Sequence, residues 1–320
     1  MWRDAEGVFF IINFLKSNIM RKIHALALIG SLVMLSSCEK PVISDDSFTS
    51  EDGTGDEVVD APTKKFTFTV KGDFGSPHFM RAGGYLSADG QDMTDLWVFD
   101  YMDGECVQSV HQQPSTAGEE WGKPVLRLRH GSHHIYFVAS RGDTPSLDAA
   151  SHAITWGTPR DTFWKDYEVE VTNTSNGNRA VTLDRVATKL KVTVLDEIPD
   201  GCASVAVTPD KWYYGWDYVA GDAVSQQHTE RIISVPSSYI GTEGNLTLSV
   251  FGLSSSQEWQ TDVTVQARNI SGDDLGTAVI HDAPFVSNRS TEYSGCLFST
   301  GVTADITLST AWSDPHVGEF

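Results

Sequence analysis

Apolar and polar residues alternate along much of the chain after residue 62, with the period of two that is typical of β-strands. The clearest alternation spans residues 65–70 and 187–194, which are also rich in the β-branched and aromatic residues that strands favour. Further strand patterns lie at residues 96–99, 125–128, 134–139, 203–207, 232–235, 246–251, 262–267 and 301–312. Turn signals such as the Asp-Gly at residues 103–104 separate them. We therefore predict an all-β fold.

The spacing of these patterns predicts how the chain is divided. Strands that follow one another without intervening helices are typical of antiparallel β-sandwiches. A chain of 320 residues is long enough for two domains of roughly 100–200 residues each. We expect one sandwich over residues 63–185 and a second over residues 186–320. Residues 146–166 show no clear strand pattern, and a short helix or a long crossover loop is expected there.

The N-terminal region carries a targeting pattern. An apolar run at residues 23–35 follows Met20 and two basic residues, and it is too short to span a membrane. It ends in Leu-Ser-Ser-Cys at Cys38, which resembles the bacterial lipobox. We predict a signal peptide over residues 1–37, translation from Met20, and a palmitate-bearing Cys38 that anchors an outer-membrane lipoprotein. The alternative is a buried helix that happens to end in cysteine.

The segment after the predicted signal peptide is acidic, and the chain as a whole carries a negative net charge. Residues 38–62 are rich in Asp and Glu and poor in apolar side chains, which is typical of a flexible tether. The whole chain has 23 basic and 43 acidic residues, a formal net charge of -20. That charge repels phosphate backbones, so nucleic acid is excluded as an expected partner.

Cys202 and Cys296 lie in the same half of the chain and either pair or remain buried thiols.

Motifs that would carry catalysis are absent from the sequence. It contains no G-x-S-x-G, no H-E-x-x-H, no phosphate-binding glycine loop and no C-x-x-C. We therefore expect that the protein is not an enzyme and binds no cofactor. A hydrolase is a distant alternative. His130, His133 and His134 cluster without a neighbouring carboxylate in the sequence. This pattern favours a partly exposed turn over a metal site, so no metal is predicted.

Residues 212–218 form the densest aromatic run in the chain. The flat rings of Trp212, Tyr214 and Trp216 are candidates for stacking on sugars, and the alternative is packing in a core or hairpin, where such residues are also favoured. Sugar stacking would make the protein a surface lipoprotein that binds glycans or a host receptor. We favour core packing.

Several segments together resemble a known family. They are the lipobox at Cys38, the acidic tether, and a first strand at residues 66–70 followed by Met80-Arg81-Ala82. Residues 93–104 (MTDLWVFDYMDG), 131–140 (GSHHIYFVAS) and 185–192 (RVATKLKV) follow in order. With these segments the chain resembles the fimbrillin-like lipoproteins of type V bacterial pili, which include fimbrial subunits and anchors.

The resemblance implies two tandem transthyretin-like, Greek-key sandwiches that assemble by strand exchange. It places a protease site between Arg81 and Ala82, although Arg81 is equally an ordinary surface arginine. Cleavage there would release the first strand, and a strand from another fimbrial subunit would fill the groove by β-augmentation. The implied function is a structural subunit or anchor of a cell-surface fimbria that contributes to adhesion, with surface glycans or proteins as further partners.

The C-terminal segment has the pattern of a donor strand. One face carries apolar residues and the other Thr, Asp and Ser. The apolar face consists of Val302, Ala304, Ile306, Leu308 and Trp312. The same pattern describes a last strand of the second sandwich, and this alternative stays open.

Overall fold

The computed structural model describes residues 62–72, 87–88, 91–141, 145–228, 230–244, 246–299, 307–308 and 318–319. Nearly all regular structure in these ranges is β-strand, so the prediction of an all-β fold is confirmed. The short helical turns are α2 (Pro114–Ala117), η2 (Gly118–Glu120) and η3 (Ser237–Tyr239). In the part of the chain described here, no helix is long and apolar enough to cross a membrane.

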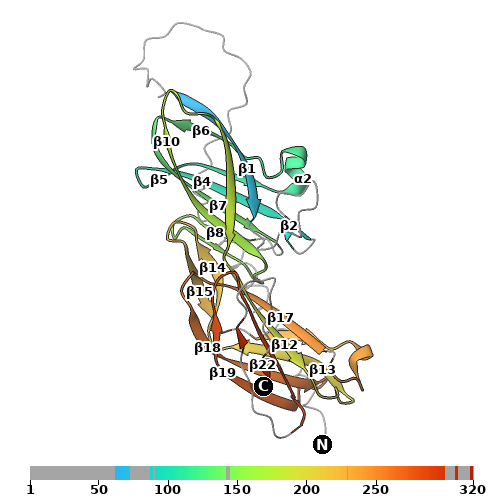
Figure 1. The fold of residues 1–320 in the computed structure, drawn as a ribbon. Coiled ribbons are helices and arrows are strands. Elements are labelled where there is room, and N and C mark those ends of the chain that lie inside the picture. Colours follow the sequence, from blue (N-terminus) through green and yellow to red (C-terminus); the bar gives the residue numbers. More distant parts are fainter. Residues whose placement is uncertain are drawn as a thin grey trace, which may run out of the picture. The chain divides into compact units, whose positions relative to one another are not determined.

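The first group of strands forms a seven-stranded sheet in the order β5-β4-β7-β10-β11-β1-β6 (Figure 1). Its strands are β1 (Thr63–Gly72), β4 (Asp95–Met102), β5 (Glu105–Gln112), β6 (Val125–Arg129), β7 (Gly131–Ser140), β10 (Thr162–Val171) and β11 (Asn178–Arg185). β10 and β11 pair only through Phe163↔Arg185 and Trp164↔Asp184. Apolar side chains from both sides of this narrow join fill one core, which makes the group a sandwich. A small hairpin of β2 (Ser87–Ala88) and β3 (Gln91–Asp92) precedes β4.

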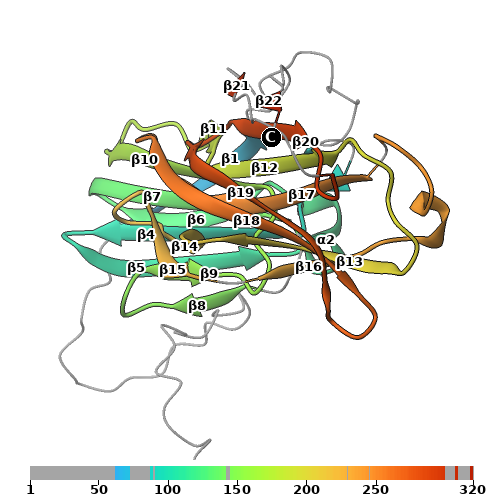
Figure 2. The same cartoon turned by 90° about the horizontal axis from the view of Figure 1, so that it is seen from below.

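The second group forms two sheets around a core of its own. One has the order β17-β12-β20-β21, with β22 also paired to β20, and the other has the order β16-β13-β18-β19 (Figure 2). The strands are β12 (Ala187–Val194), β13 (Cys202–Pro209), β16 (Arg231–Ser234), β17 (Leu246–Leu253), β18 (Trp259–Asn269), β19 (Asp274–Phe285), β20 (Ser290–Gly295), β21 (Thr307–Leu308) and β22 (Gly318–Glu319).

The two groups share one connectivity. β1 lies between antiparallel β6 and parallel β11, and β12 lies between antiparallel β17 and parallel β20. The order β5-β4-β7-β10 in the first group has its counterpart in β16-β13-β18-β19. In both groups, therefore, the first long strand pairs in parallel with the last one. The alternation of residues showed the strands but carried no information on these two parallel pairings.

A further sheet contains strands from both sides of residue 185. Its order is β15-β14-β9-β8. The strands are β8 (Ser146–Asp148), β9 (Ala153–Thr155), β14 (Trp212–Asp217) and β15 (Asp222–Gln227). β8 and β9 lie where the sequence predicted a helix or a loop. The two-domain division at residue 185 stays a prediction, because this sheet is shared between the two proposed parts.

Candidate functional site

The assembly hypothesis concerns β1, which lies between two other strands of its sheet. Its residues Thr63–Thr67 pair with β6, and Thr67–Gly72 pair with β11. In the segment just before β6, the carbonyl of Pro124 accepts from the amide of Phe68 at 3.0 Å, and the carbonyl of Gly122 accepts from that of Val70 at 2.9 Å. β1 is therefore hydrogen-bonded along both of its edges.

The inward side chains of β1 are part of the core of the first group. Phe66, Phe68 and Val70 each have 0% exposure, while the residues between them are partly exposed. The ring of Phe68 packs edge-on against Phe137 at 5.3 Å and Tyr167 at 6.0 Å between centroids. Burial of such side chains contributes roughly 1.5–3 kcal/mol each, so β1 supplies a substantial part of this core.

The residues predicted for lipidation and processing fall outside the described part of the chain. Cys38 precedes residue 62, where the description begins, and Arg81 and Ala82 lie between β1 and β2. The functions assigned to these residues therefore stay predictions.

The predicted donor segment is described only in part. Val302, Ala304, Ile306 and Trp312 lie outside the described residues, and Leu308 lies in β21. β21 pairs with β20 through Thr291↔Leu308 and Glu292↔Thr307. The backbone at Leu308 thus adds to an edge of the second group, and the donor role stays a prediction.

Trp212, Tyr214 and Trp216 of the aromatic run lie in β14, and their rings are buried. Trp212 is 0% exposed, and Tyr214 and Trp216 are each 1% exposed. The indole of Trp212 donates to the carbonyl of Phe251 at 2.9 Å and packs edge-on against Phe285 at 4.9 Å. A sugar in solvent does not reach rings in these positions, so the structure favours the core packing that we preferred over a ligand site.

Two of the clustered histidines have carboxylate partners, so the expectation that no carboxylate accompanies them is wrong. His133 is buried, with Nδ1 at 2.7 Å from Asp100 Oδ1 and Nε2 donating to the carbonyl of Arg129 at 3.0 Å. Burial raises the pKa of Asp100 in spite of the hydrogen bond with His133. His130 is exposed in the bend between β6 and β7. The carboxylates were missed because they come from strands distant in sequence.

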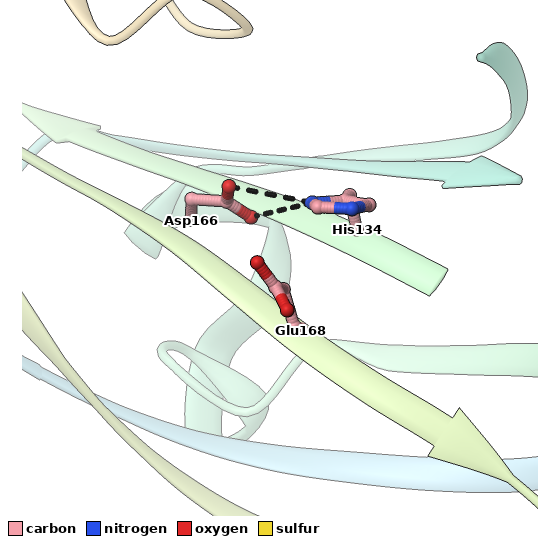
Figure 3. Close-up of side chains that lie close together, drawn as sticks. All are labelled: His134, Asp166 and Glu168. Atoms are coloured by element: carbon pink, nitrogen blue, oxygen red, sulfur yellow. Dashed lines mark hydrogen bonds and ion pairs between the residues drawn. The ribbon is translucent and has the colours of Figure 1, made fainter. Parts of the chain in front are cut away.

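The third histidine belongs to an exposed cluster on β7 and β10. His134 Nδ1 lies 3.3 Å from both carboxylate oxygens of Asp166. Glu168 is the register partner of His134 on β10, and its carboxylate lies beside the pair (Figure 3). One ligand atom from each of the three residues lies within 4.8 Å of the others. This is an arrangement of one nitrogen and two carboxylates, which is a donor set that metal ions use.

Two cysteines of the second half of the chain form no disulfide with each other. Cys202 and Cys296 are free thiols. Burial raises the pKa of the Cys202 thiol, which keeps it protonated near neutral pH. Of the two possibilities left open for Cys202 and Cys296, the structure has free thiols, and Cys202 is the buried one.

Comparison with known proteins gives matches among solved structures alone. No family model and no curated protein matches the chain. A candidate adhesin from Bacteroides ovatus is 12% identical, with 73% of this chain and 88% of that chain covered and a TM-score of 0.46. Candidate polysaccharide-binding proteins from Bacteroides thetaiotaomicron are 8% identical, with 76% and 95% covered and a TM-score of 0.47. The fimbrial anchor protein Mfa2 from Porphyromonas gingivalis is 10% identical, with 69% and 83% covered and a TM-score of 0.42.

Proposed function

We propose that the protein is a cell-surface lipoprotein that serves as a structural subunit or anchor of a bacterial fimbria, assembles by β-strand exchange and contributes to cell adhesion. The observation that carries the proposal is the position of β1, the first long strand. It is paired on both edges, and it fills the core with Phe66, Phe68 and Val70. Its removal would leave one groove that a strand of another subunit can fill.

The physical chemistry of that groove favours exchange over a permanent gap. Without β1, the backbone groups of β6 and β11 that now pair with it would lose their hydrogen bonds. Three apolar core positions would open at the same time. An incoming strand restores both interactions at once, which is the basis of β-augmentation.

The C-terminal segment has the spacing that such a groove requires. Val302, Ala304, Ile306 and Leu308 alternate with polar residues, as the buried residues of β1 alternate with partly exposed ones. Side chains on one face of a strand recur at every second residue. The segment is therefore a suitable donor for the groove of a second subunit.

Two sequence features supply the rest of the proposal. The lipobox at Cys38 would hold the precursor, or a permanent anchor, in the outer membrane through its lipid. Arg81 follows β1 and precedes β2 in the chain, so cleavage after it would separate β1 from the remainder of the sandwich. Other fimbrial subunits are the proposed partners, and surface glycans or proteins are proposed targets of adhesion.

N-terminal sequencing of the protein from outer-membrane and sheared fimbrial fractions tests this function. If the protein is a processed subunit, it should begin at Ala82 in fimbriae. The Arg81→Ala variant should begin at Cys38 and should not polymerise. Arg127→Ala, an exposed arginine on β6, is the matched control and should be processed normally. Lipidated Cys38 at the N-terminus of fimbria-associated protein assigns the anchor role. Absence of the protein from both fractions would overturn the proposal.

A further inference from the structure

The exposed cluster on β7 and β10 has the geometry of a cation site. In the antiparallel register, His134 lies opposite Glu168 and Tyr136 lies opposite Asp166. The alternation of the strands places His134, Asp166 and Glu168 on one face of the sheet (Figure 3). Paired strands hold this arrangement more rigidly than a loop would, which reduces the ordering cost of binding an ion.

The charges around the cluster are negative and lack a basic counterion. Among the described residues, the ion pair of Asp166 is with His134, and neither Asp166 nor Glu168 pairs with a lysine or arginine. The neighbouring Lys165 pairs with Asp184 instead, at 2.9 Å. The site thus concentrates negative charge that a cation would neutralise.

We propose that His134, Asp166 and Glu168 bind a divalent cation of the zinc type. An imidazole nitrogen favours Zn²⁺ and similar transition metals, whereas Ca²⁺ and Mg²⁺ favour oxygen ligands. Ligand atoms about 2.0–2.1 Å from a tetrahedral Zn²⁺ are about 3.3 Å from one another. The separation of 3.3 Å between His134 Nδ1 and each Asp166 oxygen already has that value.

Access and completeness also suit the proposal. The side chains of His134 and Asp166 are 48% and 32% exposed, so an ion enters directly from solvent. Three protein ligands leave one position of a tetrahedral ion for water. The ion would join β7 to β10 through side chains in addition to the backbone ladder, and it would stabilise the first group by mass action.

Isothermal titration of the untagged protein with Zn²⁺ tests the site, with Ca²⁺ and Mg²⁺ as comparison ions. We expect one equivalent of Zn²⁺ that binds at least tenfold more weakly, or is lost, in His134→Ala and in Glu168→Gln. Circular dichroism of both variants should match that of the unmodified protein because the side chains are on the outer face. Zn²⁺ should raise the thermal unfolding temperature of the unmodified protein and not that of the variants.

His281→Ala is the matched control. His281 Nδ1 lies 2.8 Å from Asp262 Oδ2, which gives an exposed imidazole–carboxylate pair outside the three-residue cluster. Zn²⁺ binding should be unchanged in this variant. Equal affinity in His134→Ala and the unmodified protein, or equal loss in His281→Ala, would overturn the proposal. Equal affinity for Ca²⁺ and Zn²⁺ would also overturn it, because it would indicate general attraction to an acidic surface.

Discussion

β1 and β12 occupy equivalent positions in the two groups of strands but differ in how the chain connects them. Only Val186 separates β12 from β11, and residues 195–201 lead from β12 to β13. β1 has no preceding strand in the described residues, and residues 73–94, with β2 and β3 among them, lead from it to β4. Burial does not distinguish the strands, since Leu190, Val192 and Val194 of β12 are as enclosed as the inward residues of β1.

Under the proposed assembly by strand exchange, chain connection rather than packing would decide which strand leaves. A strand tied closely at both ends cannot leave without unfolding its neighbours. If the chain is cleaved after Arg81, as proposed, β1 can leave without pulling another strand out of the sheet. We therefore expect exchange at β1 and a permanent role for β12.

The largest expected effect comes from locking β1 in place. Lys65 and Arg127 are register partners on β1 and β6 and are both exposed. A disulfide in Lys65→Cys/Arg127→Cys would hold β1 in the sheet, so polymer formation should stop in the oxidised protein and return after reduction. Size-exclusion chromatography and electron microscopy measure both states.

The matched lock joins the equivalent strands of the second group. Thr193 and Thr247 are register partners on β12 and β17, with hydroxyl oxygens 3.2 Å apart. Thr193→Cys/Thr247→Cys should polymerise equally well when oxidised and reduced. If both locks block assembly, or neither does, the distinction between β1 and β12 is wrong.

A smaller effect is expected from the ion pairs of the two groups. Arg185 contacts Asp161 through Nε at 2.8 Å and Nη2 at 3.0 Å, with both side chains 1% exposed. Lys191 contacts Glu292 at 2.9 Å, with the lysine 33% exposed. Removing one partner of a buried pair costs about 3–5 kcal/mol, while a lysine near the surface contributes about 1 kcal/mol or less.

Urea unfolding of Arg185→Ala and Lys191→Ala measures this difference. The free energy of unfolding should fall by about 3–5 kcal/mol in Arg185→Ala, because Asp161 would stay buried without its bidentate partner. Lys191→Ala should lose less than Arg185→Ala, because only Glu292 of this pair is buried and Ser290 still donates to its carboxylate. Losses of similar size would mean that the environments of the two pairs are less different than their exposure indicates.

The smallest effect concerns two histidine–carboxylate pairs of equal length. His111 and Asp95 are 2.8 Å apart in the first group, as are His281 and Asp262 in the second. Asp95 is 3% exposed and Asp262 is 38% exposed. Burial works to raise the pKa of Asp95, but hydrogen bonds with His111, Gln113 and Thr94 outweigh it and hold that pKa below its ordinary value.

This depressed pKa predicts a specific dependence on pH. Because the folded protein holds Asp95 ionised more strongly than the unfolded chain does, its contribution is present above about pH 4 and is lost as the pH falls through the folded value. Asp95→Asn should lower the free energy of unfolding by about 1–2 kcal/mol at pH 7. The difference in free energy of unfolding between Asp95→Asn and the unmodified protein should close below about pH 4. Asp262→Asn should show a smaller change. A gap that is constant down to pH 3 would contradict the assignment.

Local strand structure was the most predictable part of the fold. Alternation identified residues 65–70 and 187–194 because each buries one face, so side chains of one kind recur at every second position. β8 and β9 were missed because three residues per strand contain too few alternations to show a period. The pairing of β9 with β14 depends on residues that follow much later in the chain.

The contacts between strands were the least predictable part of the candidate site. The burial of Trp212 and Trp216 agrees with the preferred packing hypothesis, since aromatic runs are favoured in cores. The carboxylates beside His133 and His134 could not be found from sequence spacing. Their contacts depend on the register of β7 with β4 and β10, and this register follows from tertiary packing.

The parallel pairing of β1 with β11 has a consequence for the order of folding. β1 is synthesised before every other strand of its sheet, but its partner residues 178–183 are synthesised after all the others. Closing so long a segment costs chain entropy and slows folding. Until β11 arrives, Phe66, Phe68 and Val70 have only part of their core, and exposed apolar strands of this kind are prone to aggregate. During folding, this first strand therefore needs protection for longer than any other strand in the group.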